Sequence, residues 1–249
     1  MKKAKAFIGT SGYNYKHWGG GVFYPNGLPS SRWLEHYTRH FKTVELNVTF
    51  YRLPGRKTFA GWYRRTPGGF SFAIKGNRFI THLKKLKDSK DSLQLFFRNA
   101  SALKEKLSVV LWQLPANFHL NLERLDEFST LLTKNPLGKK VRQAFEFRHL
   151  SWFCPEVYSI LRKHNFSLCL AHSSRWPMVE IAAADFVYLR FHGGTVLYGS
   201  NYSEKELKEW AVKAKGFLEE GKDIYIYFNN DASGYAVKNA KRFRELLEN

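Results

Sequence analysis

Long apolar runs are missing from this 249-residue sequence, although 44% of its residues are hydrophobic. No stretch approaches the roughly 18 to 20 uninterrupted apolar residues that a membrane-spanning helix requires. The basic start Met1-Lys2-Lys3-Ala4-Lys5 runs directly into a strand-like segment, rather than into the apolar core of a signal peptide. We therefore expect a soluble, cytoplasmic protein with no membrane partner.

Cysteine and several well-known motifs are also scarce or absent. The two cysteines, Cys154 and Cys169, form no CxxC or Cys/His spacing, which argues against a zinc site or a disulfide. No GxGxxG follows the first strand-like segment, no GxSxG frames Ser11, no HExxH occurs, and no Lys-Ser or Lys-Thr follows Gly19-Gly20-Gly21. The sequence therefore identifies no cofactor, and it leaves the oligomeric state open.

Acidic residues are few, with 21 Asp and Glu against 40 Lys and Arg, so the formal net charge is +19. A surface this basic attracts nucleic acid through the release of counterions, whatever the fold is for. Only Lys84-Lys85-Leu86-Lys87 is dense enough to form a cluster. A solvated basic face and a nucleic-acid partner both remain open on this evidence of charge.

Alternating apolar patterns and helical apolar patterns follow one another along the whole chain, without a linker or a composition break. Eight segments have the pattern of strands: 6–10, 43–49, 70–77, 108–113, 144–148, 166–171, 185–192 and 223–229. Helical patterns follow most of them, except at 172–184, a short stretch interrupted by Pro177. We predict an α/β fold over residues 1–249, a single (β/α)8 TIM barrel with a parallel eight-stranded sheet, whose usual length is about 250 residues.

Strand parity predicts that the barrel interior is unusually polar. Alternate residues of a barrel strand face the helices and the interior, and one face of each strand is apolar here. The opposite faces carry Glu45, Asn47, Lys75, Gln113, Glu146, Arg148, Arg190, His192 and Asn229, followed by Asp231. Ions in such an interior cost several kcal/mol unless they are paired. Either these charges neutralise one another in a structural network, or they form a polar pocket at the carboxyl ends of the strands.

The sequence resembles the uncharacterised DUF72 family, also called the YecE-like family, over essentially its whole length. The resemblance lies in Gly9-Thr10-Ser11-Gly12, Trp18, Tyr24-Pro25, Val44-Glu45-Leu46-Asn47, Thr49-Phe50-Tyr51, Lys75, Thr81-His82, Gln113-Leu114-Pro115, Glu146-Phe147-Arg148-His149, Trp152, Asp185, Tyr188 to Gly193, Tyr227-Phe228-Asn229-Asn230 and Asn239-Ala240. Tyr13 departs from the family, which often has Trp there. The resemblance implies a TIM barrel but no settled activity, since this fold hosts many chemistries.

An anion-binding enzyme of hydrolase or lyase type accounts for the inner cations, because arginine suits phosphate and carboxylate groups. The catalytic candidates are Glu45, Glu146, His192 and Asp231. The expected ligand-binding residues are Asn47, Lys75, Gln113, Arg148, Arg190, Asn229 and Trp152. The expected partner is an anionic small molecule bearing a phosphate or a carboxylate, although the substrate itself is not identified.

Two other uses of these residues remain open. A metal centre, as in a metal-dependent nuclease, would draw on Glu45, Glu146, His192 and Asp231, with His82 or His172. A nucleic-acid-binding or nuclease-like protein would combine the basic surface with exposed aromatics at Trp18, Tyr24 and Trp152. Packing in a large core is the alternative account of these rings, and a non-catalytic anion-binding barrel is the alternative account of the polar pocket.

Overall fold

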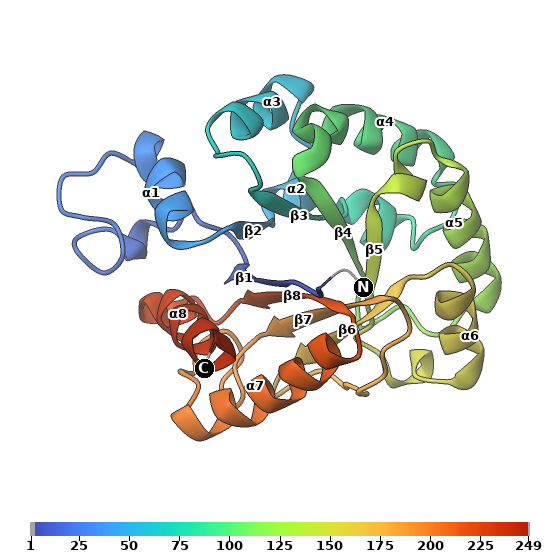
Figure 1. Cartoon of the computed structure of the whole chain (residues 1–249). Helices are drawn as coiled ribbons and strands as arrows, with labels where there is room; N and C mark the ends of the chain where they lie inside the picture. Colours follow the sequence, from blue (N-terminus) through green and yellow to red (C-terminus); the bar gives the residue numbers. More distant parts are fainter. Residues whose placement is uncertain (1–2, 249) are drawn as a thin grey trace.

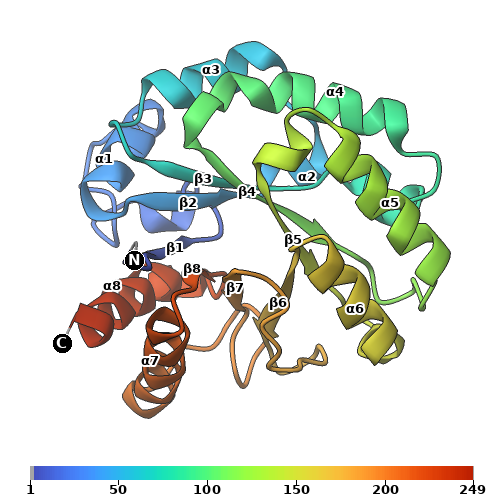
Figure 2. The ribbon, with the colours of Figure 1, turned by 45° about the vertical axis from the view of Figure 1, so that its right-hand side comes forward.

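Eight parallel strands form a nearly closed barrel in the computed structural model, which describes residues 3–248 (Figures 1 and 2). The strands are β1 (Ala6–Thr10), β2 (Thr43–Leu46), β3 (Ser71–Lys75), β4 (Leu107–Gln113), β5 (Arg142–Glu146), β6 (Ser167–His172), β7 (Phe186–Phe191) and β8 (Asp223–Phe228). Each strand from β2 to β7 pairs with the strand that follows it in the chain, and β8 pairs with β1. The predicted TIM-barrel fold is confirmed.

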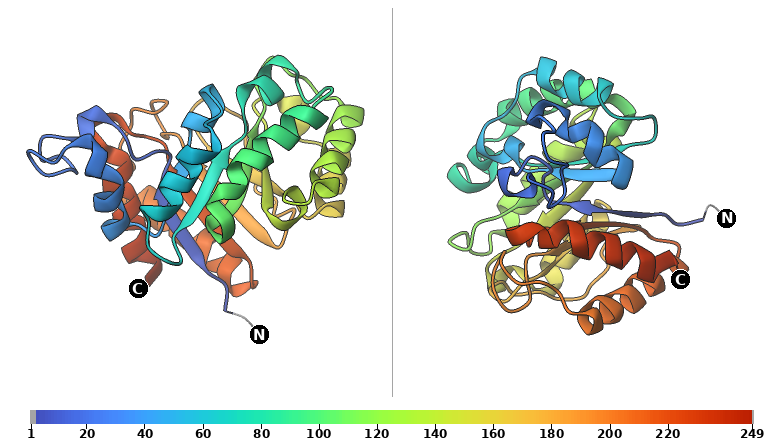
Figure 3. Two further views of the ribbon diagram at one scale, coloured as in Figure 1. Left: turned by 90° about the horizontal axis from the view of Figure 1, so that it is seen from above. Right: turned by 90° about the vertical axis from the view of Figure 1, so that its left-hand side faces the viewer.

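Helices surround this barrel on its outer side (Figures 1 and 3). They are α1 (Trp33–His40), α2 (Val48–Tyr51), α3 (Arg56–Arg64), α4 (Lys90–Ala100), α5 (Leu122–Lys134), α6 (Pro155–Lys163), α7 (Glu204–Glu219) and α8 (Tyr235–Glu248). The segment between β6 and β7 contains no helix, as the short and Pro-interrupted stretch 172–184 led us to expect. Within residues 3–248, no helix is both long enough and apolar enough to span a membrane.

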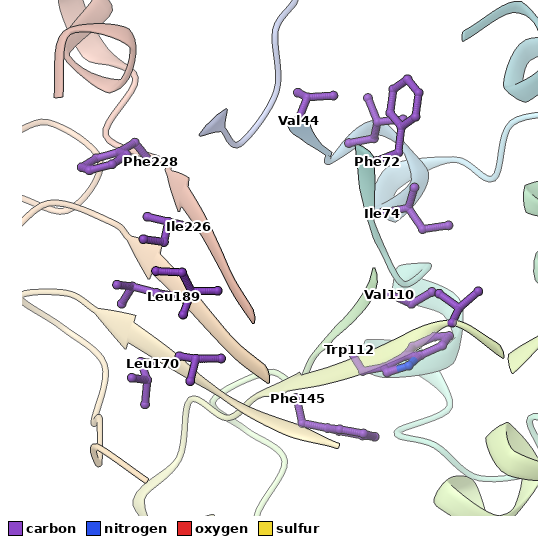
Figure 4. Packing of buried hydrophobic residues seen from close by; sticks show 14 of the residues in the cluster. Val44, Phe72, Ile74, Val110, Trp112, Phe145, Leu170, Leu189, Ile226 and Phe228 are labelled. Atoms are coloured by element: carbon purple, nitrogen blue, oxygen red, sulfur yellow. The ribbon is translucent and has the colours of Figure 1, made fainter. Parts of the chain in front are cut away.

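The outward faces of the strands hold the barrel to its helices. Phe145 on β5, Leu189 on β7 and Phe228 on β8 are at most 3% exposed and point away from the barrel in Figure 4. Because successive side chains of a strand point to opposite faces, their neighbours Glu146 and Arg190 point inward. The apolar outer row therefore fixes the register that carries the charged residues into the interior.

The hydroxyl group of Tyr37 connects β1 and β2, the two neighbouring strands of the barrel that are paired least. In the described chain, β1 and β2 share a single parallel bridge, between Ser11 and Glu45. Tyr37 of α1 is fully buried, and its hydroxyl accepts a hydrogen bond from Thr10 N (3.0 Å) and donates one to Thr43 O (3.0 Å). The hydroxyl thus satisfies two backbone groups that a continuous ladder would have paired.

Strand β2 is shorter than predicted. It ends at Leu46, and Val48 begins the short helix α2, so the expected alternation over 43–49 fails beyond Leu46. Val48 is 48% exposed instead of facing the helices. Thr49 is buried and its hydroxyl donates to Leu46 O (2.9 Å) and Lys75 O (2.6 Å). These bonds tie the end of β2 to the end of β3, where polar residues gather.

Candidate functional site

Arg190 of β7 lies between two buried carboxylates inside the barrel. Its Nη2 donates to Glu45 Oε1 of β2 (2.7 Å), and its Nη1 donates to Glu146 Oε2 of β5 (2.5 Å). All three side chains are at most 1% exposed. Burial lowers the pKa of Arg190, but the two carboxylates outweigh burial and hold it well above its usual range. The arginine is therefore a permanent cation that neutralises much of the charge of both glutamates.

The carboxylates of Glu45 and Glu146 accept further hydrogen bonds from other side chains. Ser11 Oγ donates to Glu45 Oε1 (2.6 Å), and Tyr188 OH donates to Glu45 Oε2 (2.6 Å). Arg148 Nε donates to Glu146 Oε1 (2.9 Å). Burial raises the pKa of Glu146, but Arg190 and Arg148 outweigh burial and bring it well below its usual range. Glu146 is thus held as an ion and is a poor proton donor at neutral pH.

Lys75 remains without an acidic partner after this pairing. The carboxylates of Glu45 and Glu146 are matched by the guanidinium groups of Arg190 and Arg148. Among the described residues, no hydrogen-bond acceptor or carboxylate is within bonding distance of Lys75 Nζ, which lies 4.2 Å from the centre of the Phe50 ring. Burial and the charge of Arg190 lower the pKa of Lys75 to about 7.

A pocket of about 620 Å³ opens at the carboxyl ends of the strands above this network. Lys75, Arg148 and Arg190 contribute cationic groups to its wall, and Asp231 contributes a carboxyl group. The other lining residues are Gly12, Tyr13, Asn14, Tyr15, Leu46, Asn47, Val48, Tyr51, Trp62, Tyr198 and Asn229. Such a mixture of apolar walls and a few convergent polar groups is typical of a small-molecule site.

Asp231 and Asn47 add polar groups at the edge of the pocket. Burial raises the pKa of Asp231, whose carboxylate lies 3.6 Å from His17 Nε2. Asn47 occupies the N-cap position of α2 without a side-chain capping hydrogen bond, and its Oδ1 is buried without a hydrogen-bond partner among residues 3–248. An unsatisfied buried amide oxygen next to a pocket is available to accept a hydrogen bond from a ligand.

Three of the four predicted catalytic residues do not line the pocket. Glu45, Glu146 and His192 are fully buried behind it. His192 Nδ1 lies 3.0 Å from Asn229 Nδ2, and its Nε2 lies 3.3 Å from Arg190 Nη1. Burial and Arg190 lower the pKa of His192 to about 4, so the imidazole is neutral at pH 7. Of the four, Asp231 is the one that lines the pocket.

Two predicted ligand-binding residues also lie elsewhere. Gln113 is 2% exposed, and its Nε2 lies 3.4 Å from His82 Nε2. Trp152 is fully buried, stacks on Phe147 (4.9 Å between ring centres) and donates from Nε1 to Phe118 O (2.6 Å). The structure does not bring Trp152 to the pocket, because its two faces and its N–H are all used in the core.

The aromatics expected to be exposed are buried as well. Trp18 and Tyr24 are both 0% exposed, and Tyr24 stacks on Trp33 (4.5 Å between ring centres). The expectation that Trp18, Tyr24 and Trp152 form an exposed platform for nucleic-acid bases is therefore wrong. Packing inside a large aromatic core explains them.

Of the histidines and carboxylates considered for a metal centre, His192 and Glu146 lie close together, with 3.6 Å between Nε2 and Oε2. His172 lies on the outer side of the barrel, where its Nδ1 is 2.9 Å from Tyr202 OH and its ring contacts Trp210. Over the part of the chain that the structure describes, no group of three or more His, Cys, Asp or Glu side chains is arranged to hold a metal ion.

The sequence did not predict Tyr198, which lines the pocket, or Trp176, which contacts Arg148 but does not line the pocket. Tyr198 comes from the long loop after β7, and its hydroxyl lies 3.5 Å from Arg148 Nη2. Trp176, from the helix-free segment after β6, is stacked by the Arg148 guanidinium at 4.5 Å. Neither loop has a periodic pattern that could have placed these side chains. Tyr13, which also lines the pocket, is the residue that departs from the usual Trp of the family.

Three comparisons with known proteins agree on the relationships of the chain. The sequence model described as "Protein of unknown function DUF72" matches residues 7–249. The "UPF0759 protein YunF" of Bacillus subtilis strain 168 is 27% identical, over 97% of this chain and 94% of its own length. The crystal structure of a DUF72 family protein from Thermotoga maritima has a TM-score of 0.86 and 32% identity, and covers 98% of this chain and 100% of that one. One from Enterococcus faecalis, at 18% identity over 98% and 96% of the two chains, has a TM-score of 0.83, which shows the shared fold alone.

Proposed function

The chain belongs to the DUF72 family, and we propose that it is an enzyme of hydrolase or lyase type that acts on a small anionic substrate. The substrate carries a carboxylate or a phosphate and binds in the pocket at the carboxyl end of the barrel. Active sites of TIM-barrel enzymes are built at this end of the strands. The family does not supply the reaction, so the proposal rests on the pocket itself.

The uncompensated amino group of Lys75 is the observation that supports this proposal most strongly. A purely structural network would pair each buried charge, as Arg190 does with Glu45 and Glu146. Lys75 instead faces the pocket with its Nζ over the Phe50 ring and with no ion-pair partner among the described residues, and its positive charge disfavours an empty site. A bound anion would supply the missing negative charge.

Arg148 is the second group expected to contact the anion. Its Nε is occupied by Glu146, and its guanidinium plane is held against Trp176, so the side chain is fixed in orientation. Its Nη2 has only the long contact to Tyr198 OH (3.5 Å). Preorganised arginine N–H groups of this kind bind carboxylate and phosphate oxygens with little loss of side-chain entropy.

Asp231, Asn47 and Asn229 supply the remaining polar chemistry of the pocket. Asp231 has a raised pKa, so it can take up and release a proton closer to neutral pH than an exposed aspartate. Asn47 Oδ1 is free to accept a hydrogen bond from the substrate. Asp231 is the group we assign to proton transfer, and the two asparagines orient the substrate.

Thermal unfolding in the presence of small anions tests this function. We expect phosphate, malonate or small phosphorylated and carboxylated metabolites to raise the melting temperature of the wild type, because ligands that bind only the native state stabilise it. The shift should disappear in Lys75→Met and Arg148→Met and persist in Lys84→Met, which removes a partly exposed lysine outside the pocket. A broad set of such anions that leaves the wild type unshifted would contradict the proposal.

A further inference from the structure

We propose that Lys75 is a nucleophile that forms a Schiff base with the carbonyl group of an anionic oxo compound. This inference rests on the proposed function and deepens it, since it names both the reacting atom of the protein and the substrate class. The substrate class is an aldehyde or a ketone that also carries a carboxylate or a phosphate.

A second buried lysine shows how this fold treats a lysine with a structural role. Lys106, 5% exposed, donates from Nζ to Tyr63 O (2.8 Å), Thr66 O (2.6 Å) and Thr66 Oγ1 (3.1 Å). All three N–H groups of its ammonium ion are used. Lys75, 9% exposed, has no such acceptor within residues 3–248 and opens on the pocket. The contrast indicates that the Lys75 amine is kept free for a ligand.

The position of Lys75 is rigid although its amine is free. The residue ends β3 and pairs with Leu111 of β4, and its carbonyl oxygen accepts the hydroxyl of Thr49. Nζ lies over the face of the Phe50 ring, a cation–π contact that the protonated amine makes in the absence of a ligand. A nucleophile held on a strand has the fixed position expected of a reactive lysine.

The charges around Lys75 favour its neutral form. Burial is the largest cause, Arg190 and Arg148 also disfavour protonation, and Glu146 and Glu45 favour it to a smaller extent. The nearby His82 is neutral at pH 7, because burial and Lys75 lower its own pKa to about 4. Burial and these charges together lower the pKa of Lys75 to about 7. About half of the amine is then neutral at pH 7, against under about one in a thousand for a lysine with the ordinary pKa of about 10.4.

The reaction balances with groups that the pocket supplies. The Lys75 Nζ lone pair attacks the carbonyl carbon and forms a C–N bond as the C=O π bond breaks, and one of the two protons of the attacking nitrogen is transferred to the carbonyl oxygen to give a carbinolamine. Asp231 is the group assigned to this proton transfer. Loss of the hydroxyl group with a second proton releases water and leaves a protonated C=N bond. No oxidant or reductant is involved.

The anionic group of the substrate has a defined role in this scheme. A protonated Schiff base at Lys75 would carry a positive charge beside Arg190 and Arg148, the same charges that favour the neutral amine. A carboxylate or phosphate on the substrate brings a negative charge to that position. We therefore expect a neutral carbonyl compound of equal size to react far less.

Reductive trapping on the full-length protein tests the inference. Glyoxylate and sodium cyanoborohydride would convert a reactive lysine to carboxymethyl-lysine, which peptide mass spectrometry locates. At pH 7 we expect Lys75 to be modified at least about tenfold faster than the partly exposed Lys84. Lys106, whose three N–H groups are all hydrogen-bonded, should stay unmodified. The rate at Lys75 should rise as the pH increases from 6 to 8, fall with inorganic phosphate as competitor, and drop at least tenfold with methyl glyoxylate.

The outcomes separate this inference from the proposed function. Labelling of Lys75 no faster than that of Lys84 overturns the Schiff-base assignment. If small anions still raise the melting temperature of the wild type in that case, the anion pocket stands without a nucleophilic lysine. If neither labelling nor stabilisation occurs, both proposals fail. Lys75→Arg, which retains the charge, must lose the adduct whatever its stability, because arginine cannot form it.

Discussion

Arg190 is a buried cation in the interior of the barrel. It contacts two carboxylates, lies 3.4 Å from Ser11 Oγ, and keeps its Nε without a partner among the residues described. A buried charge triad of this kind is weak evidence for stability in itself, because desolvation opposes the attraction between the charges. Removal of one member of the triad nevertheless lowers the free energy of unfolding strongly, since it leaves the other charges buried and unpaired.

The first prediction concerns this triad. Arg190→Met should lower the free energy of unfolding by about 3 to 5 kcal/mol, because it leaves Glu45 and Glu146 without their shared cation. Urea unfolding measures the change. The additional replacements Glu45→Gln and Glu146→Gln should recover part of the loss. Arg242→Met, which breaks only exposed ion pairs on α8, is the control with little expected change. Equal effects of the two arginine variants would contradict this account of the triad.

The second prediction concerns the pH dependence of stability at Lys75. Its folded pKa of about 7 lies below the ordinary value of about 10.4, so between these values the unfolded chain binds more protons. Lys75 therefore destabilises the fold below pH 7, and this effect is lost as the pH rises toward 10. Lys75→Met should be more stable than the wild type at pH 7, and the difference should shrink by up to about 1.4 kcal/mol per pH unit above that. A constant difference from pH 6 to 9 would contradict it.

At the scale of elements, the predicted alternation of side chains is found along β7 but ends early in β2. Strand β7 has apolar residues at every second position, and this row packs outward as predicted. Strand β2 stops early because Asn47 adopts helical angles and starts α2, although Val48-Thr49-Phe50-Tyr51 are residues that favour strands. Bonds from Thr49 to Leu46 and Lys75 override this local preference. Such contacts between strands are not visible in a local pattern.

The third prediction belongs to the seam between β1 and β2. Tyr37→Phe removes the hydroxyl shared by Thr10 N and Thr43 O, so two buried backbone groups lose their partner. We expect a loss of about 1 to 3 kcal/mol in unfolding free energy and faster hydrogen exchange at the Thr10 amide. Tyr63→Phe, which loses only an exposed contact to Glu105, is the matched control. An unchanged exchange rate at Thr10 in Tyr37→Phe would show that the hydroxyl does not hold the seam.

At the scale of the whole molecule, sequence patterning was enough to predict the barrel and to bring the inner charged residues to one end. It could not sort those residues by role. Glu45, Glu146 and Lys75 are equivalent by strand parity, but the first two are saturated by Arg190 and Arg148 while Lys75 is not. That distinction depends on distances between side chains from different strands. The loop residues Tyr198 and Trp176 were missed for the same reason.

The fourth prediction concerns the net charge of +19. Any affinity for DNA or RNA should fall steeply between low and physiological salt, because it arises from released counterions rather than from an exposed aromatic platform. Fluorescence anisotropy with a labelled oligonucleotide at rising salt measures this. Sequence-selective binding that survives physiological salt would favour a nucleic-acid function over the small-anion enzyme.

The central claim is that the unpaired amine of Lys75 and the oriented guanidinium of Arg148 form one anion site. A crystal structure determined with a small carboxylate or phosphate ligand tests it most directly, with thermal stabilisation by the same compound measured in solution. The account predicts electron density for the anionic group between Lys75 Nζ and the Arg148 Nη atoms, with Arg190 still bound to Glu45 and Glu146. A stabilising ligand found elsewhere on the molecule, with only water beside Lys75, would contradict it.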